Sequence, residues 1–167
     1  MDARFPTGKF SFNPTATDAD RQASIAAIGG LLAELRPALA AAQLERPYRE
    51  GGWTARQVVH HLADSHMNAF IRFRLALTED RPTIKPYDEA AWAKLADATL
   101  DPQISVQILD GLHQRWLVML NAMSAADFAR EAVHPDHGPR TLDWFLQLYA
   151  WHGRHHIGHL KLTAVGA

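Results

Sequence analysis

The chain has 167 residues, a length typical of one domain, and its 47% hydrophobic and 21% charged residues are ordinary for a globular protein. A formal net charge of −1, without a long basic run, argues against nucleic acid or an acidic membrane as the main partner. Cysteine is absent, which excludes disulfides and thiolate metal ligands, and no apolar run approaches the ~20 residues of a membrane span.

The N-terminal part of the chain predicts an arm followed by a helix. Residues 1–16 are polar and broken by prolines, unlike a signal peptide, so we expect an extended arm on a single cytoplasmic domain that covers 1–167. From Asp18 onward, apolar residues recur every three or four positions, which predicts one buried helical face. Pro37 is expected to kink or end this helix. The apolar residues of the face are Ile25, Ile28, Leu32 and Leu35.

A second helix is predicted from about 55 to 79, after a loop over 47–52. Thr54 and Gln57 have the spacing of a capping box, in which each side chain bonds a backbone amide near the other. The following stretch is broken by prolines and predicts a connection, with a short helical piece around 89–95. The apolar stripe of the second helix comprises Val59, Leu62, Ala63, Phe70, Phe73 and Leu77.

Two further helices complete the predicted fold. Asp101 and Pro102 are expected to start a third helix that ends near residue 123. A loop is predicted over 134–140, and Thr141 is expected to cap a fourth helix. No stretch shows a convincing strand pattern. Four long amphipathic helices predict an all-α protein, a four-helix bundle with long connections.

Four of the ten histidines lie between His152 and His159, at the end of the fourth helix. Residues four apart share a helical face, so His152 with His156, and His155 with His159, each form a pair that could bind one metal ion. His152 and His156 continue the apolar stripe of this helix. We therefore expect them, rather than His155, to face inward.

The second helix offers a third nitrogen ligand from His60, His61 or His66. Three histidines leave coordination positions open for water or substrate, as in catalytic sites, whereas a structural zinc is normally closed by four ligands. Asp64 is a candidate to orient a ligand histidine or to act as a catalytic base. The alternative is a helix surface that carries histidines without binding a metal.

Longer blocks of the sequence carry a family resemblance. GGWTARQVVHHLADSHMNAFIRFRLALTED, PTIKPYDEAAWAKLAD and YAWHGRHHIGHL, together with RFPTGKF in the arm, resemble the YfiT branch of the DinB superfamily over almost the whole chain. The resemblance implies a four-helix bundle, usually dimeric, with one divalent metal, zinc or nickel, per subunit. The histidine before Leu-Ala-Asp, His61, would bind this metal with His152 and His156. His159 is not expected to be a ligand.

The resemblance implies two reaction classes for a small-molecule substrate. Related proteins join a low-molecular-weight thiol (bacillithiol, mycothiol or glutathione) to an electrophile, and we expect this S-transfer as the activity. The branch is also labelled as metal-dependent hydrolases, which implies metal-bound hydroxide acting on an amide or ester, with Asp64 as the nearest candidate base. A metal-binding stress protein without turnover is the third alternative.

Several residues outside the histidine cluster have competing interpretations. His113 is expected to be a hydrogen-bonded core residue, and His134 and His137 to be exposed. Arg72 and Arg74 are candidates to pair with carboxylates of a thiol cofactor, with solvated positions on a helix face as the alternative. Trp53 is expected to belong to a hydrophobic staple before the second helix. Pocket-lining candidates besides Arg72 are Tyr87, Trp92 and Trp151.

Overall fold

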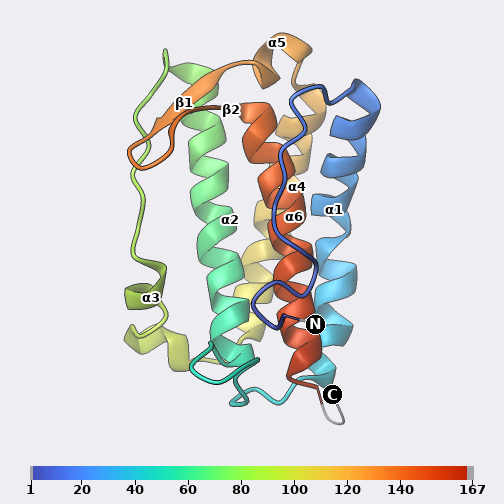
Figure 1. The fold of residues 1–167 in the computed structure, drawn as a ribbon, viewed down its shortest axis with the longest axis vertical. Coiled ribbons are helices and arrows are strands. Elements are labelled where there is room, and N and C mark those ends of the chain that lie inside the picture. Colours follow the sequence, from blue (N-terminus) through green and yellow to red (C-terminus); the bar gives the residue numbers. More distant parts are fainter. Residues whose placement is uncertain (1, 165–167) are drawn as a thin grey trace.

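A bundle of four long helices forms the body of the protein, as predicted (Figure 1). The structure is a computed structural model that describes residues 2–164. The bundle comprises α1 (Asp18–Ala41), α2 (Ala55–Thr78), α4 (Gln103–Ala122) and α6 (Leu142–Leu162). Helices α1 and α6 run in one direction and α2 and α4 in the other (Figure 1). Helix α1 packs against α6 and α4, and α2 packs against α4 and α6, so that α1 lies diagonally opposite α2.

Three of the four long helices begin at a threonine whose hydroxyl accepts a hydrogen bond from a backbone amide of the first turn. Thr54 forms the predicted capping box with Gln57, and Thr141 caps α6. Thr17 forms a second capping box at the start of α1. At the start of α4, the Asp101 carboxylate accepts a bond from the Gln103 amide at 2.9 Å. These local signals explain why the helix starts were predictable.

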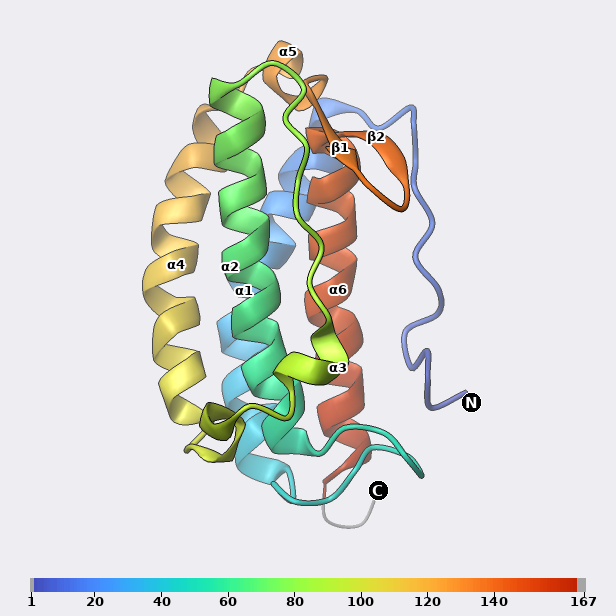
Figure 2. The same cartoon turned by 90° about the vertical axis from the view of Figure 1, so that its left-hand side faces the viewer.

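A long crossover joins α2 to α4. Because these two helices run in the same direction, the chain must return along the whole bundle, and it does so beside α2 and α6 (Figure 2). The crossover contains the short helix α3 (Glu89–Trp92), which Asp88 caps, and the 3-10 helix η1 (Ala96–Thr99). Helix α3 ends before the predicted residue 95. Its position brings residues 86–92 next to the middle of α2.

The expectation of no strands is wrong for one small hairpin. After the short helix α5 (Ala125–Phe128), β1 (Glu131–His134) pairs antiparallel with β2 (Gly138–Thr141). The predicted loop over 134–140 is therefore partly strand. Four-residue strands are too short to show alternation. The crossover also stabilises β1, since Val133 exchanges backbone hydrogen bonds with Pro82 and Ile84.

Of the two expected effects of Pro37, a kink or the end of the helix, the second does not occur. The helix continues to Ala41 with Pro37 in its interior. Proline removes the amide that would bond the carbonyl four residues earlier, here that of Ala33. Both residues are exposed, so water can bond that carbonyl. The loss is therefore small enough for the helix to tolerate.

Helix α1 is also the one helix, within residues 2–164, whose length and composition would allow it to cross a membrane. It therefore comes nearer to a membrane span than the sequence led us to expect. Core helices of globular proteins meet the same criterion. Here α1 buries one face against α4 and α6. The buried residues are Ile25, Ile28, Leu31, Leu35 and Leu39.

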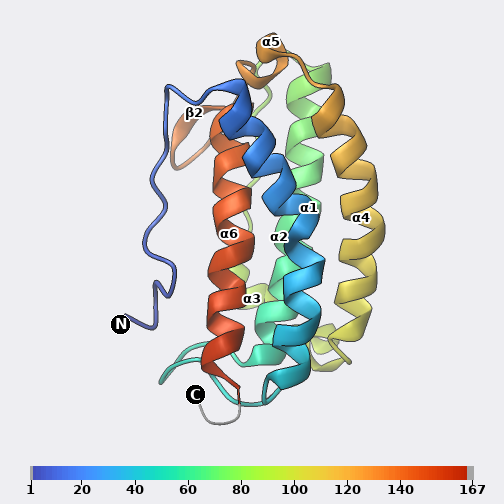
Figure 3. The same cartoon turned by 90° about the vertical axis from the view of Figure 1, so that its right-hand side faces the viewer.

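The N-terminal arm runs alongside α6, without helix or strand over residues 2–16, as predicted (Figure 3). The Gln147 side chain exchanges two hydrogen bonds, of 2.9 and 3.0 Å, with the backbone of Asn13. The Trp151 indole donates to the Gly8 carbonyl at 3.1 Å. The arm therefore covers the face of α6 that does not point into the bundle.

Candidate functional site

The structure brings together the three histidines that the sequence selected. His61 extends from α2, and His152 and His156 extend from successive turns of α6. One nitrogen from each ring lies within 4.8 Å of those of the other two. The Nε2 atoms of His61 and His152 are 3.2 Å apart. We call these three residues the histidine cluster.

The geometry of the histidine cluster fits a divalent metal. Two imidazole nitrogens on a tetrahedral zinc, each about 2.0–2.1 Å from the ion, lie about 3.3 Å apart. The separation of 3.2 Å between His61 and His152 is close to this value. Two ligands come from one helix at the i, i+4 spacing, and the third comes from the neighbouring helix. The site therefore needs little rearrangement to bind an ion.

Burial keeps the histidine cluster neutral. It lowers the pKa of His61 to about 4 and places those of His152 and His156 well below the ordinary value of 6.5. Repulsion between neighbouring imidazolium ions acts in the same direction as burial. A metal binds the neutral form of imidazole. Protons therefore compete weakly for these nitrogens at neutral pH.

A cavity of ≈ 440 Å³ opens onto the histidine cluster. Trp53, expected only as a hydrophobic staple, forms part of its wall: the ring centroid is 4.6 Å from that of His61. Trp151, a predicted pocket residue, lies on the same cavity. The metal position is thus open to a small molecule on one side. The other lining residues include Arg4, Tyr48, Arg49, Glu89, His155 and His159.

The second histidine pair of α6 lies beside the histidine cluster. His159 Nδ1 is 3.2 Å from His156 Nδ1, and the Tyr48 ring stacks on His159 at 3.8 Å between centroids. His155 was expected to lie off the inward face, yet it is buried. Trp151 stacks on it at 4.4 Å, and Phe5 of the arm lies 6.2 Å away. The arm, which helix periodicity does not take into account, explains this burial.

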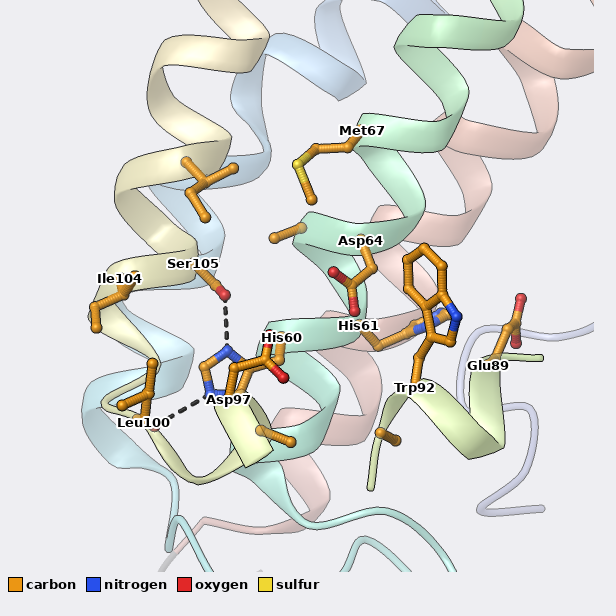
Figure 4. A pocket seen from close by; sticks show the side chains of 14 residues that line it. His60, His61, Asp64, Met67, Glu89, Trp92, Asp97, Leu100, Ile104 and Ser105 are labelled. Carbon is orange, nitrogen blue, oxygen red and sulfur yellow. Dashed lines mark hydrogen bonds between the residues drawn. The ribbon is translucent and has the colours of Figure 1, made fainter. Parts of the chain in front are cut away.

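His60 lies on a different side of α2 from His61. Its Nδ1 is 2.7 Å from the Ser105 hydroxyl, and its Nε2 is 3.1 Å from the Leu100 carbonyl (Figure 4). Both nitrogens therefore bond to groups in and before α4. Of the two adjacent histidines, His61 alone belongs to the histidine cluster.

Asp64 lies away from the position expected of an orienting residue. Its carboxylate faces a cavity of ≈ 140 Å³ that His60, His61 and Asp97 also line (Figure 4). Burial, and secondarily the charge of Asp97, raises the pKa of Asp64. Within residues 2–164 it makes no hydrogen bond to a histidine. The orienting role finds no support in the structure, and the role of catalytic base stays a prediction.

Glu89 is a carboxylate that the sequence interpretation missed. It lies at the start of α3 and lines the ≈ 440 Å³ cavity together with His61 and His152. The residue as a whole is exposed, but its carboxyl group is partly buried. This burial is the main cause that raises the pKa of Glu89, and the positive charge of Arg72 lowers it. Its sequence signal was weak, since only the return of the crossover places it there.

Another pair of histidines, one on α2 and one on α4, is buried in the core next to the histidine cluster. His66 Nδ1 and His113 Nε2 are 2.8 Å apart, and both residues are at most 2% exposed. His113 is thus a hydrogen-bonded core residue, as predicted. His66 lies 5.8 Å from His152 between ring centroids but is not one of the three converging residues. Of the remaining histidines, His137 is exposed as expected, whereas His134 is partly buried in β1.

The chain is similar in sequence to known proteins over nearly its whole length. The sequence profile of the DinB superfamily matches residues 16–160. A protein of Bacillus mycoides strain KBAB4, named "Putative metal-dependent hydrolase", is 48% identical over 162 residues, covering 95% of this chain and 94% of the relative. A protein of the same name from Bacillus cereus matches with the same identity and coverage.

One solved structure matches over nearly the whole fold. It is YfiT from Bacillus subtilis, described as "a probable metal-dependent hydrolase with an unusual four-helix bundle topology". It is 42% identical in sequence, with a TM-score of 0.92 over 96% of this chain and 94% of that chain. The parallel α2 and α4, and the crossover that they require, belong to this shared topology.

Proposed function

Since the chain belongs to the DinB superfamily, we propose that it is a divalent-metal-dependent enzyme that activates a low-molecular-weight thiol for transfer to an electrophile. His61, His152 and His156 are the proposed ligands of zinc or nickel. The observation that carries this proposal is the convergence of three neutral imidazoles, two buried and one partly buried, at the wall of a ≈ 440 Å³ cavity. The named relatives support a metal-dependent enzyme in general, and the thiol chemistry is the part we add.

The chain's own residues would hold the ion and shape the space beside it. Bound at the histidine cluster, a divalent cation supplies a positive charge that lowers the pKa of a thiol or water molecule next to it. Trp53 and Tyr48 provide aromatic walls for the cavity. Arg49 adds a positive charge at the same cavity, which favours an anionic nucleophile.

The proposed reaction is a substitution at carbon. The thiolate sulfur attacks a carbon of the electrophile, a carbon–sulfur bond forms, and the bond to the leaving halide, or to the oxygen of an epoxide ring, breaks with its electron pair. Once a thiolate is present, this attack requires no general base. The chain has no cysteine, so the small-molecule thiol would carry the sulfur, and no protein thiol would compete for the electrophile.

Hydrolysis of an amide or ester is the second candidate, because the relatives are named as hydrolases. Water needs a base that takes its proton, and Glu89, on the cavity of the histidine cluster, is better placed for this than Asp64. A metal-binding role without turnover is less favoured, because a closed structural site would not need the open cavity.

Conjugation to monochlorobimane tests the proposed activity. Zinc- or nickel-loaded protein is mixed with bacillithiol, mycothiol, glutathione or no thiol, with a chelated sample as control. We expect metal-dependent conjugation with one of the thiols, and its loss in His152→Ala but not in His60→Ala. If no thiol accelerates conjugation although the metal is bound, the transferase proposal fails, and an ester and amide screen on the same samples, with Glu89→Gln, tests hydrolysis.

A further inference from the structure

A second cavity, of ≈ 370 Å³, lies on the other side of His152. Helices α2 and α6, the crossover and the β1–β2 hairpin enclose it, so it shares a wall with the histidine cluster. Its lining is largely aromatic, with one arginine, Arg72, from α2. Predicted pocket residues Arg72 and Tyr87 therefore lie here. The remaining lining residues include Ser65, Glu89, Asp136, Trp144, Phe145 and Tyr149.

Among the residues that the structure describes, Arg72 lacks a counter-ion. It is partly buried, and it donates to the Tyr149 hydroxyl at 2.9 Å and to the Lys85 carbonyl at 3.4 Å. In the described part of the chain, its Nε is buried without a hydrogen-bond partner. Within residues 2–164, no carboxylate lies within 4.0 Å of the guanidinium group. Its hydrogen bonds go to neutral oxygens, and the charge of Glu89 acts on it only from beyond ion-pair distance, so Arg72 retains room for a contacting anion.

Other arginines of the chain provide a comparison for Arg72. Arg74, two residues along α2, is exposed and lies over the Phe70 ring at 5.2 Å. It fits the alternative of a solvated charge on a helix face. Arg21, by contrast, is partly buried like Arg72 but pairs with Asp143 at 3.2 Å. Arg72 combines the partial burial of Arg21 with the absence of an ion pair among the described residues, as Arg140 of β2 also does, but of these two only Arg72 lines the cavity.

The charges around the cavity narrow the choice of ligand. Asp136 is exposed at the rim, and Glu89 also lies on the cavity. Two acidic residues disfavour a dianion such as a phosphate. A single carboxylate fits better, because its two oxygens can accept parallel N–H bonds from one guanidinium group. The aromatic lining suits the hydrocarbon part that carries this carboxylate.

We infer that this cavity binds a carboxylate of the small molecule that reacts at the histidine cluster, and that Arg72 forms the ion pair. The inference rests on the proposed function, since both groups belong to one molecule. The Tyr149 ring, whose hydroxyl Arg72 contacts, is 5.9 Å from that of His152. His152 and Glu89 line both this cavity and the cavity at the histidine cluster, so one small molecule can contact both. The substrate class is a thiol that also carries a carboxylate.

Two matched thiols test the inference in cobalt-loaded protein. The probes are ω-mercaptohexanoate and ω-mercaptohexanol, titrated while the thiolate-to-cobalt charge-transfer absorption is followed. We expect the carboxylate to bind roughly tenfold more tightly, as for a charge-assisted hydrogen-bonded pair. Arg72→Gln should remove this preference without changing the cobalt content. Arg72→Lys should retain part of it, and the matched control Arg74→Gln should retain all of it.

The outcomes separate this inference from the thiol chemistry. Equal affinities of the two thiols in the unmodified protein, or an unchanged preference in Arg72→Gln, would overturn the carboxylate site. If neither thiol produces the absorption band, thiol activation is refuted. Saturation-transfer NMR with hexanoate and hexanamide then tests the carboxylate site separately. An Arg72-dependent preference for hexanoate supports the carboxylate site, and its absence overturns it.

Discussion

Adjacent residues of α2 have opposite surroundings, and this difference decides which histidine can bind a metal. A shift of one residue turns a side chain by about 100° around a helix. His60 therefore reaches Ser105 and the Leu100 carbonyl, whereas His61 faces α6. The resemblance to the YfiT branch already selected His61. The hydrogen bonds of His60 give an independent physical reason for the same choice.

The first prediction compares these two positions. His61→Ala should abolish tight zinc binding, because it removes one of three converging nitrogens. His60→Ala should leave zinc affinity nearly unchanged, since His60 bonds only to the α4 side. A competition titration with a coloured chelator measures both, and circular dichroism checks that the bundle remains helical. Loss of zinc in His60→Ala but not in His61→Ala would contradict the assignment.

The second prediction concerns His159, which lies behind a proposed ligand. If His156 donates its Nδ1 proton to His159 Nδ1, 3.2 Å away, its Nε2 is fixed as the atom that is free to bind a metal. His159→Ala should then weaken zinc binding roughly 10–100-fold. His159→Gln should recover part of the affinity, because an amide oxygen can also accept this bond. Equal affinities of the two variants and the unmodified protein would exclude the orienting role.

At the scale of the elements, local chemistry predicted the helices but not the connections. Capping threonines and apolar repeats lie within a few residues of each other, so the sequence reveals them directly. The β1–β2 hairpin depends instead on backbone bonds to residues 82–84, about fifty positions earlier in the chain. Pro37 is a similar case, since only its exposure explains why α1 continues past it.

The candidate site likewise contains residues that local sequence predicts and residues whose position depends on distant parts of the chain. His152 and His156 follow from their spacing on one helix, and the family resemblance added His61. The unpaired state of Arg72 and the position of Glu89 could not be predicted, because both depend on where the crossover returns against α2. Asp64 is a different case. Its nearness in sequence to His61 suggested an orienting hydrogen bond, which is absent among the described residues although both line one cavity, and its role as catalytic base stays a prediction.

The third prediction tests the contact between the arm and α6. Gly158 lies where a Cβ atom would come within 2.7 Å of Pro6, whose ring cannot easily move away. Gly158→Ala should therefore displace the arm and uncover His155, at a cost of about 1–3 kcal/mol for the overpacked contact. Limited proteolysis should cut residues 2–16 faster in this variant.

A matched glycine provides the control for helix propensity. A Cβ atom added at Gly111 in α4 would meet no other atom within 4 Å among the described residues. Gly111→Ala should raise the free energy of unfolding by up to about 1 kcal/mol and leave the arm protected. If Gly158→Ala is cleaved no faster than Gly111→Ala, the arm does not depend on the close approach at Gly158.

At the scale of the whole molecule, the histidine cluster links α2 to α6. A metal that binds only the folded state stabilises it in proportion to the logarithm of its concentration over Kd. The fourth prediction is that zinc raises the Tm and that a chelator reverses the increase. At a free zinc concentration of about 100 Kd, the gain is about 2.7 kcal/mol. His156→Ala should show no such increase, and a zinc-dependent Tm in that variant would indicate binding elsewhere.

Acid stability depends on the same buried imidazoles. In the folded chain the pKa of His61 and His113 is lowered to about 4, mainly by burial, against 6.5 in the unfolded chain. Above pH 6.5 these histidines are neutral in both the folded and the unfolded chain, so they contribute no pH dependence to the stability. Between pH 6.5 and about 4 the unfolded chain binds protons that the folded chain does not. Stability must therefore decrease as the pH falls through this range.

The fifth prediction is the size and origin of this decrease. Each buried histidine contributes about 1.4 kcal/mol per unit of pKa difference, so the metal-free protein should lose several kcal/mol between pH 7 and pH 5. Urea unfolding at a series of pH values measures this slope. His113→Gln keeps a side chain able to hydrogen-bond His66 but removes one titrating group, so its slope should be shallower. A flat profile in the unmodified protein would mean that the buried histidines are already protonated, or that water reaches them.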